Sequence, residues 1–169
     1  RELLESLGAQ AGDDAELRRA IADEYHRLGD YAAAEAVIAK GPQDDQSYSL
    51  RAALLAQAED KTALGRLYDE LRSRSNEPDP QRRLLLGQIA EFLERYDEAL
   101  SWYRGVPGGG QRWSARLRAA NVLHELKRSD EAYKSLRELQ SDAAAGDEAR
   151  RGADLVGASL RAQDQGGAG

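Results

Sequence analysis

Small residues that stand twelve positions apart recur along this chain, and they limit the folds that it can adopt. The clearest pair is Gly87 and Ala99, which flank the polar turn Glu94-Arg95. Apolar residues at helical spacing give each flanking segment one apolar stripe, formed by Leu86, Ala90, Leu93, Leu100 and Tyr103. A small residue on each stripe lets two antiparallel helices touch, so the stretch 86–103 predicts a helical hairpin.

The same kind of pair returns at three other places. They are Ala22 with Ala34, Ala53 with Gly65, and Ala120 with Ala132, of which the second is the least clear. The second members of the four pairs follow one another at intervals of 31, 34 and 33 residues (65 − 34, 99 − 65 and 132 − 99). A nearly constant period of this length is typical of an array in which each repeat is one helical hairpin.

With these residues the chain resembles the tetratricopeptide repeat (TPR) family, whose repeats follow the pattern small-x2-large on the first helix and Ala-x3-large on the second. The matches are Gly87/Ala90 with Ala99/Tyr103, Ala22/Tyr25 with Ala34/Ile38, and Ala120/Leu123 with Ala132/Leu136. The resemblance implies an all-α fold, a right-handed TPR-type solenoid of about four hairpins with partial terminal helices. In the second repeat Asp69 stands where the other repeats have a large apolar residue, so we expect a shifted or irregular hairpin there.

Helix start and stop signals define one predicted domain over residues 1–163, with a disordered tail at 164–169. The repeats are expected at about 15–42, 45–75, 79–107 and 111–141, followed by a terminal helix at 147–161. Gly8 is expected to end a short first helix, and Asp79-Pro80 to begin the third repeat. Ser129 is expected to cap the last paired helix. The chain begins with Arg1 and contains no methionine, so we expect it to be an excised segment or a processed product.

Composition narrows the possible functions. The 169 residues include no cysteine and two histidines, which excludes disulfides, thiolate zinc sites and a cysteine nucleophile. The net charge of −6 argues against a nucleic-acid partner. No apolar run approaches 18 residues, so no direct membrane insertion is expected. The glycine run 108–110 lacks the Lys-Ser/Thr of a phosphate loop, and no catalytic or cofactor motif is present, so we expect neither an enzyme nor a cofactor.

The TPR resemblance implies a concave surface, lined by the first helices of the hairpins, that receives a peptide or a helix of a partner protein. Polar residues at equivalent positions of those helices are the candidates for partner binding. They are Arg19, Asp23, His26, Arg51, Gln88, Glu91, Arg118, Asn121 and His124. His26 and His124 lie three repeats apart, so no metal site is expected between them. Leu50, Leu54, Leu84 and Leu117 make the middle of this face apolar, which favours a helix or an apolar peptide over a charged chain terminus.

These observations predict a non-catalytic scaffold or adaptor that binds a protein segment. The alternative is a self-association module that pairs through its ends, using Leu3, Leu4 and Leu7 at one end and Leu155, Val156 and Leu160 at the other. The run 85–106, followed by 108–112 and 115–120, also resembles lipid-anchored periplasmic TPR adaptor proteins of proteobacteria. That narrower resemblance implies a bacterial protein, periplasmic as part of a larger anchored chain, with a cytoplasmic location as the alternative.

Overall fold

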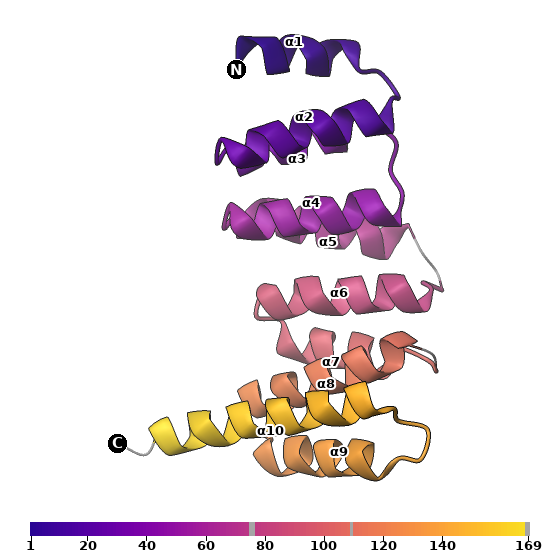
Figure 1. Ribbon diagram of the computed structural model, residues 1–169, viewed down its shortest axis with the longest axis vertical. Coiled ribbons are helices and arrows are strands. Elements are labelled where there is room, and N and C mark those ends of the chain that lie inside the picture. Colours follow the sequence, from indigo (N-terminus) through magenta and orange to yellow (C-terminus); the bar gives the residue numbers. More distant parts are fainter. Residues whose placement is uncertain (75–76, 109, 168–169) are drawn as a thin grey trace. The chain divides into compact units, whose positions relative to one another are not determined.

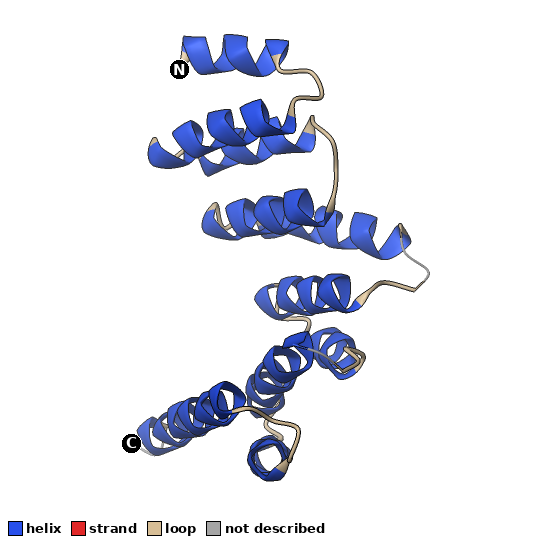
Figure 2. Cartoon of the chain, turned by 45° about the vertical axis from the view of Figure 1, so that its right-hand side comes forward, coloured by secondary structure: helices blue, strands red, loops and turns tan. Residues whose placement is uncertain are grey.

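The computed structural model describes residues 1–74, 77–108 and 110–167, and within those ranges every regular element is a helix (Figure 2). The prediction of an all-α chain is therefore confirmed. The helices, labelled in Figure 1, are α1 (Glu2–Gln10), α2 (Ala15–Arg27), α3 (Tyr31–Ala39), α4 (Asp45–Gln57), α5 (Lys61–Ser73), α6 (Pro80–Phe92), α7 (Tyr96–Arg104), α8 (Gly110–Glu125), α9 (Ser129–Ser141) and α10 (Asp147–Gly166).

The helices group into two compact units. The single domain over 1–163 stays a prediction. Unit 1 spans residues 1–74 and unit 2 spans residues 75–169. In unit 1, α2 packs against α3 and α4 against α5, while α3 also contacts α4. In unit 2, α6 packs against α7 and α8 against α9, and α10 packs against both α8 and α9. Consecutive helix pairs are thus the building block of each unit.

Each hairpin turns through three residues, namely 28–30, 58–60, 93–95 and 126–128. The middle residue of every turn has a positive φ, which is 76° at Gly29, 55° at Glu59, 60° at Glu94 and 64° at Lys127. Its N–H donates to the carbonyl three residues earlier, and the next N–H donates to the carbonyl five residues earlier, as in Gly29 to His26 and Asp30 to Tyr25. These bonds form a Schellman motif that satisfies the last carbonyls of the first helix.

Aspartates cap five of the described helices, α2 to α6. The carboxylates of Asp14, Asp30, Asp44, Asp60 and Asp79 each accept a hydrogen bond from a backbone N–H in the first turn of the helix that follows. Two predictions of helix ends are wrong. Arg128, not Ser129, precedes α9 and makes no side-chain cap bond, and α1 continues through Gly8 to Gln10 because a glycine can also adopt helical dihedrals.

The small residues of three hairpins lie at the predicted helix contacts. Ala34, Ala99 and Ala132 are fully buried, and a β-carbon added to Gly87 would lie 2.5 Å from Cε1 of Tyr103. The prediction for Ala53 and Gly65 is wrong, because the buried residues of the second hairpin are Ala52, Leu64 and Tyr68, each one position earlier. With these residues the second hairpin keeps the twelve-residue spacing of the others (64 − 52), so the irregular hairpin expected from Asp69 is not observed. Leu64 replaces the alanine of the other hairpins, and α4 and α5 are the least closely packed of the four pairs.

The terminal helix is longer than the sequence predicts. Residues 164–166, which the sequence predicts to be disordered, belong to the last turn of α10. The carboxylate of Asp164 accepts a hydrogen bond from the Tyr133 hydroxyl at 2.5 Å and lies 2.7 Å from Nε2 of His124. These partners on α8 and α9 hold the end of α10 in place. The predictions for residues 75–76, 109 and 168–169 lie outside the described residues.

Candidate functional site

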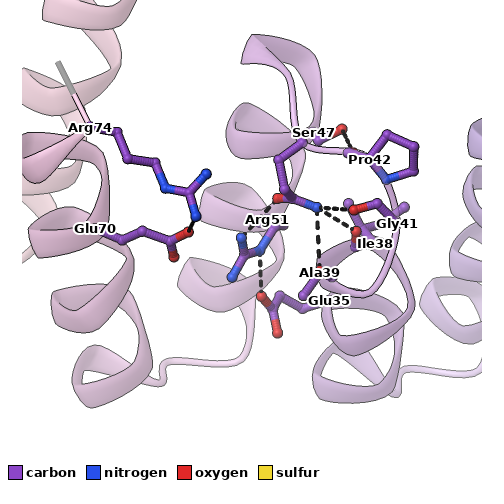
Figure 3. Close-up of polar contacts among 10 residues, drawn as sticks. Glu35, Ile38, Ala39, Gly41, Pro42, Ser47, Arg51, Glu70 and Arg74 are labelled. Atoms are coloured by element: carbon purple, nitrogen blue, oxygen red, sulfur yellow. Dashed lines mark hydrogen bonds and ion pairs between the residues drawn. The ribbon is translucent and has the colours of Figure 1, made fainter. Parts of the chain in front are cut away.

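Arg51, a predicted partner-binding residue of unit 1, contacts side chains of its own chain. Its Nε donates to Glu35 at 2.8 Å, and one terminal nitrogen donates to the Gln43 side chain at 2.9 Å (Figure 3). The Gln43 amide donates in turn to the carbonyls of Ile38 and Gly41. The Arg51 side chain is only 13% exposed. Because Glu35 belongs to α3 and Arg51 to α4, this network joins the two hairpins of unit 1.

The other predicted residues of unit 1 lie on or near the surface of α2. Nε2 of His26 lies 3.2 Å from the side-chain oxygen of Gln57, and the His26 ring lies against Tyr31 with 5.2 Å between centroids. Arg19 is half-buried and Asp23 is exposed. Hydrogen bonds from Ser47 and, more weakly, the charge of Arg19 lower the pKa of Asp44. The predicted residues of α2 therefore lie along one helix, but they do not all contact one another.

In unit 2, the predicted residues of α6 and α8 are brought together around Tyr103. The buried Tyr103 hydroxyl donates to Glu91 at 2.7 Å. Burial and this hydrogen bond raise the pKa of Tyr103 far above its usual value, and the charge and a hydrogen bond of Arg118 oppose that shift. Glu91 of α6 and Arg118 of α8 thus meet at one hydroxyl. Gln88 and Asn121 occupy equivalent half-buried positions on the same two helices.

His124 is covered by α10. Its side chain is 12% exposed, and its Nε2 faces the Asp164 carboxylate. Hydrogen bonds from Tyr133 and then from His124 lower the pKa of Asp164. His124 therefore acts within the chain as a contact for the last turn of α10, whereas His26 makes its contacts in unit 1.

Within the described ranges, no three His, Asp or Glu side chains form a group that could hold a metal ion. None of the helices described combines the length and the apolar character needed to cross a bilayer.

A basic cluster that the sequence reasoning missed lies on a different side of α8. Arg112 and Arg116 both approach Trp113, with 5.0 and 5.3 Å between guanidinium carbon and ring centroid, and both face Asp142. The hydrogen bond from the Ala144 N–H and, after it, the charges of the two arginines lower the pKa of Asp142. The spacing of four residues between Arg112 and Arg116 places them on one helix face, and this spacing could have indicated the cluster from the sequence.

Both units contain a groove of the same construction. In unit 2 a cavity of about 400 Å³ lies over α8, between the end of α7 and α9. In unit 1 a cavity of about 390 Å³ lies over α2, between α1 and α3. Comparison of the chain with protein-family models, with curated proteins and with solved structures gave no match.

Proposed function

We propose that this chain is a non-catalytic helical-repeat scaffold of the tetratricopeptide type that binds a segment of a partner protein. The proposed binding surface is the polar face of the first helices of the hairpins. On unit 2 this face carries Gln88, Arg118 and Asn121. An apolar peptide or a helix is the proposed cargo, since Leu84 and Leu117 are half-buried residues of the same two helices.

The observation that supports this proposal is that polar residues of α6 and α8 meet at one buried hydroxyl group. These two first helices contact each other directly, and the Tyr103 hydroxyl lies between Glu91 on one and Arg118 on the other. Tyr103 is buried and belongs to α7, so its hydroxyl holds these polar side chains in position. A partner segment lying across both helices would meet amide and guanidinium groups that are already positioned, which lowers the entropy lost on binding.

Photocrosslinking tests the proposed surface. A benzophenone side chain would replace Gln88 or Asn121, and the matched control positions are Ser101 on α7 and Ser159 on α10, both exposed. We expect the same protein from the source organism to crosslink at both test positions and at neither control. Its capture should be lost in the folded double variant Gln88→Ala/Asn121→Ala. Equal crosslinking at all four positions, or none at the test positions, would contradict the proposal.

Self-association is a second candidate, favoured by one exposed leucine at the surface of α10. Leu155 is 72% exposed, whereas Leu160, predicted to share its surface, is 1% exposed within unit 2. Leu4 and Leu7 pack against the core of unit 1, which leaves Leu3 exposed there. Light scattering over a dilution series would reveal a dimer that Leu155→Glu dissociates. A monomer at every concentration would exclude this candidate.

A further inference from the structure

The groove over α8, which we call the α7–α9 groove, has an apolar floor and charged walls. Val106, Ala119 and Leu123 are buried residues of its lining. A more open extension of about 560 Å³ continues from it along α9 and shares Arg112, Arg116, Lys134 and Glu138 with it. The lining residues of α9 run from Glu131 to Ser141. Ten residues of helix measure about 15 Å, the length of about five extended residues.

The charge of this groove is opposite in sign to that of the chain. Its lining and that of its extension include five cations, namely Arg104, Arg112, Arg116, Lys134 and Arg137, and three carboxylates, so the local balance is +2 (5 − 3). The whole chain has a charge of −6. An acidic segment would therefore be attracted to this one surface, while the acidic chain as a whole repels a longer polyanion such as a nucleic acid.

Several of these cations can still contact a ligand. The ion pair of Lys134 with Glu138 is 4.0 Å long and well exposed, so it is weak. Asp142 is shared by Arg112 and Arg116 at 3.8 and 3.4 Å, which leaves each guanidinium with further donors. Among the described residues, the Arg137 guanidinium has no ion-pair partner, and its side chain is exposed.

The equivalent groove of unit 1 shows that these charges are not required by the fold. Positions 98 residues apart line both grooves, and Ala33 and Ala36 of unit 1 correspond to Glu131 and Lys134 of unit 2 (131 − 33 and 134 − 36). Arg18 corresponds to Arg116, but it is 7% exposed and donates to the backbone carbonyls of Gly12 and Val37. In unit 1 this arginine supports the fold, whereas in unit 2 Arg116 faces the groove.

We propose that the α7–α9 groove binds an acidic segment of a partner protein, about five residues long, independently of the face formed by α6 and α8. Carboxylates of the segment contact Arg116, Lys134 and Arg137, and an apolar side chain between them lies on Ala119 and Leu123. The apolar floor favours an aliphatic residue, and the guanidinium groups favour carboxylates as bidentate partners.

Binding of a defined peptide tests this proposal on the full chain. The probe is fluorescein-labelled Asp-Glu-Leu-Glu-Asp with an amidated end, measured by anisotropy at about 0.05 M salt, where surface charges are weakly screened. The control peptide is its amide isostere, Asn-Gln-Leu-Gln-Asn. We expect saturable binding of the acidic probe below about 1 mM and at least about tenfold weaker binding of the isostere.

Matched variants assign the binding to the groove. Lys134→Gln/Arg137→Gln removes two positive charges from it, and Arg66→Gln/Arg151→Gln removes two exposed charges elsewhere. We expect about tenfold weaker binding for the first pair and little change for the second, with both variants folded by circular dichroism. Equal loss in both pairs, equal binding of the two peptides, or no saturation by the wild-type chain would overturn the proposal. Preference for a single-stranded oligonucleotide that depends on the same residues would also overturn it.

Discussion

The Tyr103 ring occupies the space that a side chain on Gly87 would need. An ideal β-carbon at Gly87 would lie 2.5 Å from Cε1 and 2.7 Å from Cδ1 of that ring. Tyr103 is itself fully buried and hydrogen-bonded to Glu91, so the ring cannot move aside without losing that contact. The α6–α7 hairpin therefore requires the absence of a side chain at one position.

Gly87→Ala should destabilise unit 2 by about 1–3 kcal/mol, because the added methyl group overpacks the hairpin. Gly108→Ala is the control, since a β-carbon there would meet nothing within 4 Å. The fourth hairpin has Ala120 and Leu136 at the equivalent positions, so Gly87→Ala should be better tolerated when combined with Tyr103→Leu. Urea unfolding of the wild type, of the single variants Gly87→Ala and Tyr103→Leu and of the double variant measures this coupling. An additive double variant would show that the two residues do not compete for space.

Glu59→Gly and Lys127→Gly should each stabilise the chain by about 0.5–1 kcal/mol. Both residues have a positive φ, which strains an L-residue and suits glycine. Gly29→Ala should have the opposite effect of about 1 kcal/mol, although a β-carbon there has open space, because only the backbone conformation opposes it. Thermal unfolding of the three variants gives the sign of each change in stability. Stabilisation by Gly29→Ala would mean that the turn conformation is wrong.

Arg18→Met should destabilise unit 1 by about 1–3 kcal/mol. The substitution keeps much of the apolar stem but removes the donors to the Gly12 and Val37 carbonyls, which lie 2.7 and 2.9 Å away. Arg66→Met on the exposed surface of α5 is the matched control and should change stability little. Chemical denaturation followed by circular dichroism measures both. Equal changes in stability for the two variants would show that the hydrogen bonds of Arg18 do not stabilise unit 1.

The contact of Asp164 with Tyr133 and His124 should make the stability of unit 2 depend on acid pH. The folded state lowers the pKa of Asp164, so its contribution is present above the unfolded value of about 3.9 and is lost as the pH falls through the lower folded value. Asp164→Asn should therefore destabilise unit 2 at neutral pH, and the difference from wild type should close below about pH 4.

Tryptophan fluorescence can follow that difference, because Trp102 and Trp113, the two tryptophans of the chain, both belong to unit 2. Asp69→Asn on α5 is the control and should leave this signal unchanged. A constant difference between wild type and Asp164→Asn from pH 3 to pH 7, which spans the unfolded value of about 3.9, would exclude a role for the Asp164 charge.

The repeat, the helices and most of their starts could be read from the sequence, because small pairs, aspartate caps and apolar stripes are local signals. The second hairpin was placed one residue late, since the Ala52-Ala53 run offers two small residues and only packing distinguishes them. Glu59, Glu94 and Lys127 carry no local sign of a left-handed turn. The sequence predicts order only to residue 163, because the stretch that follows is polar. That stretch is ordered through contacts with α8 and α9, which are distant in the sequence.

The candidate site was harder to predict than the fold. Helical spacing could place Arg51 and His124 on the first helices, but it could not show that Glu35 and Asp164 contact them. Arg112, Arg116 and Lys134 were not predicted as site residues, because the groove that they share forms only where α8 and α9 pack together. Charged residues on adjacent helices acquire their roles only when the helices pack.

The constant three-residue turn has a consequence for engineering this chain. One residue inserted beside Glu94 would rotate α7 by about 100° relative to its present contact with α6, and would carry Ala99 away from Gly87. The described connections outside the hairpins differ in length, at four residues for 11–14 and five for 40–44, so they are not restricted to one spacing. Epitope tags and fluorescent labels therefore belong in the loops between hairpins, such as the exposed Pro107-Gly108 step, and never inside a hairpin.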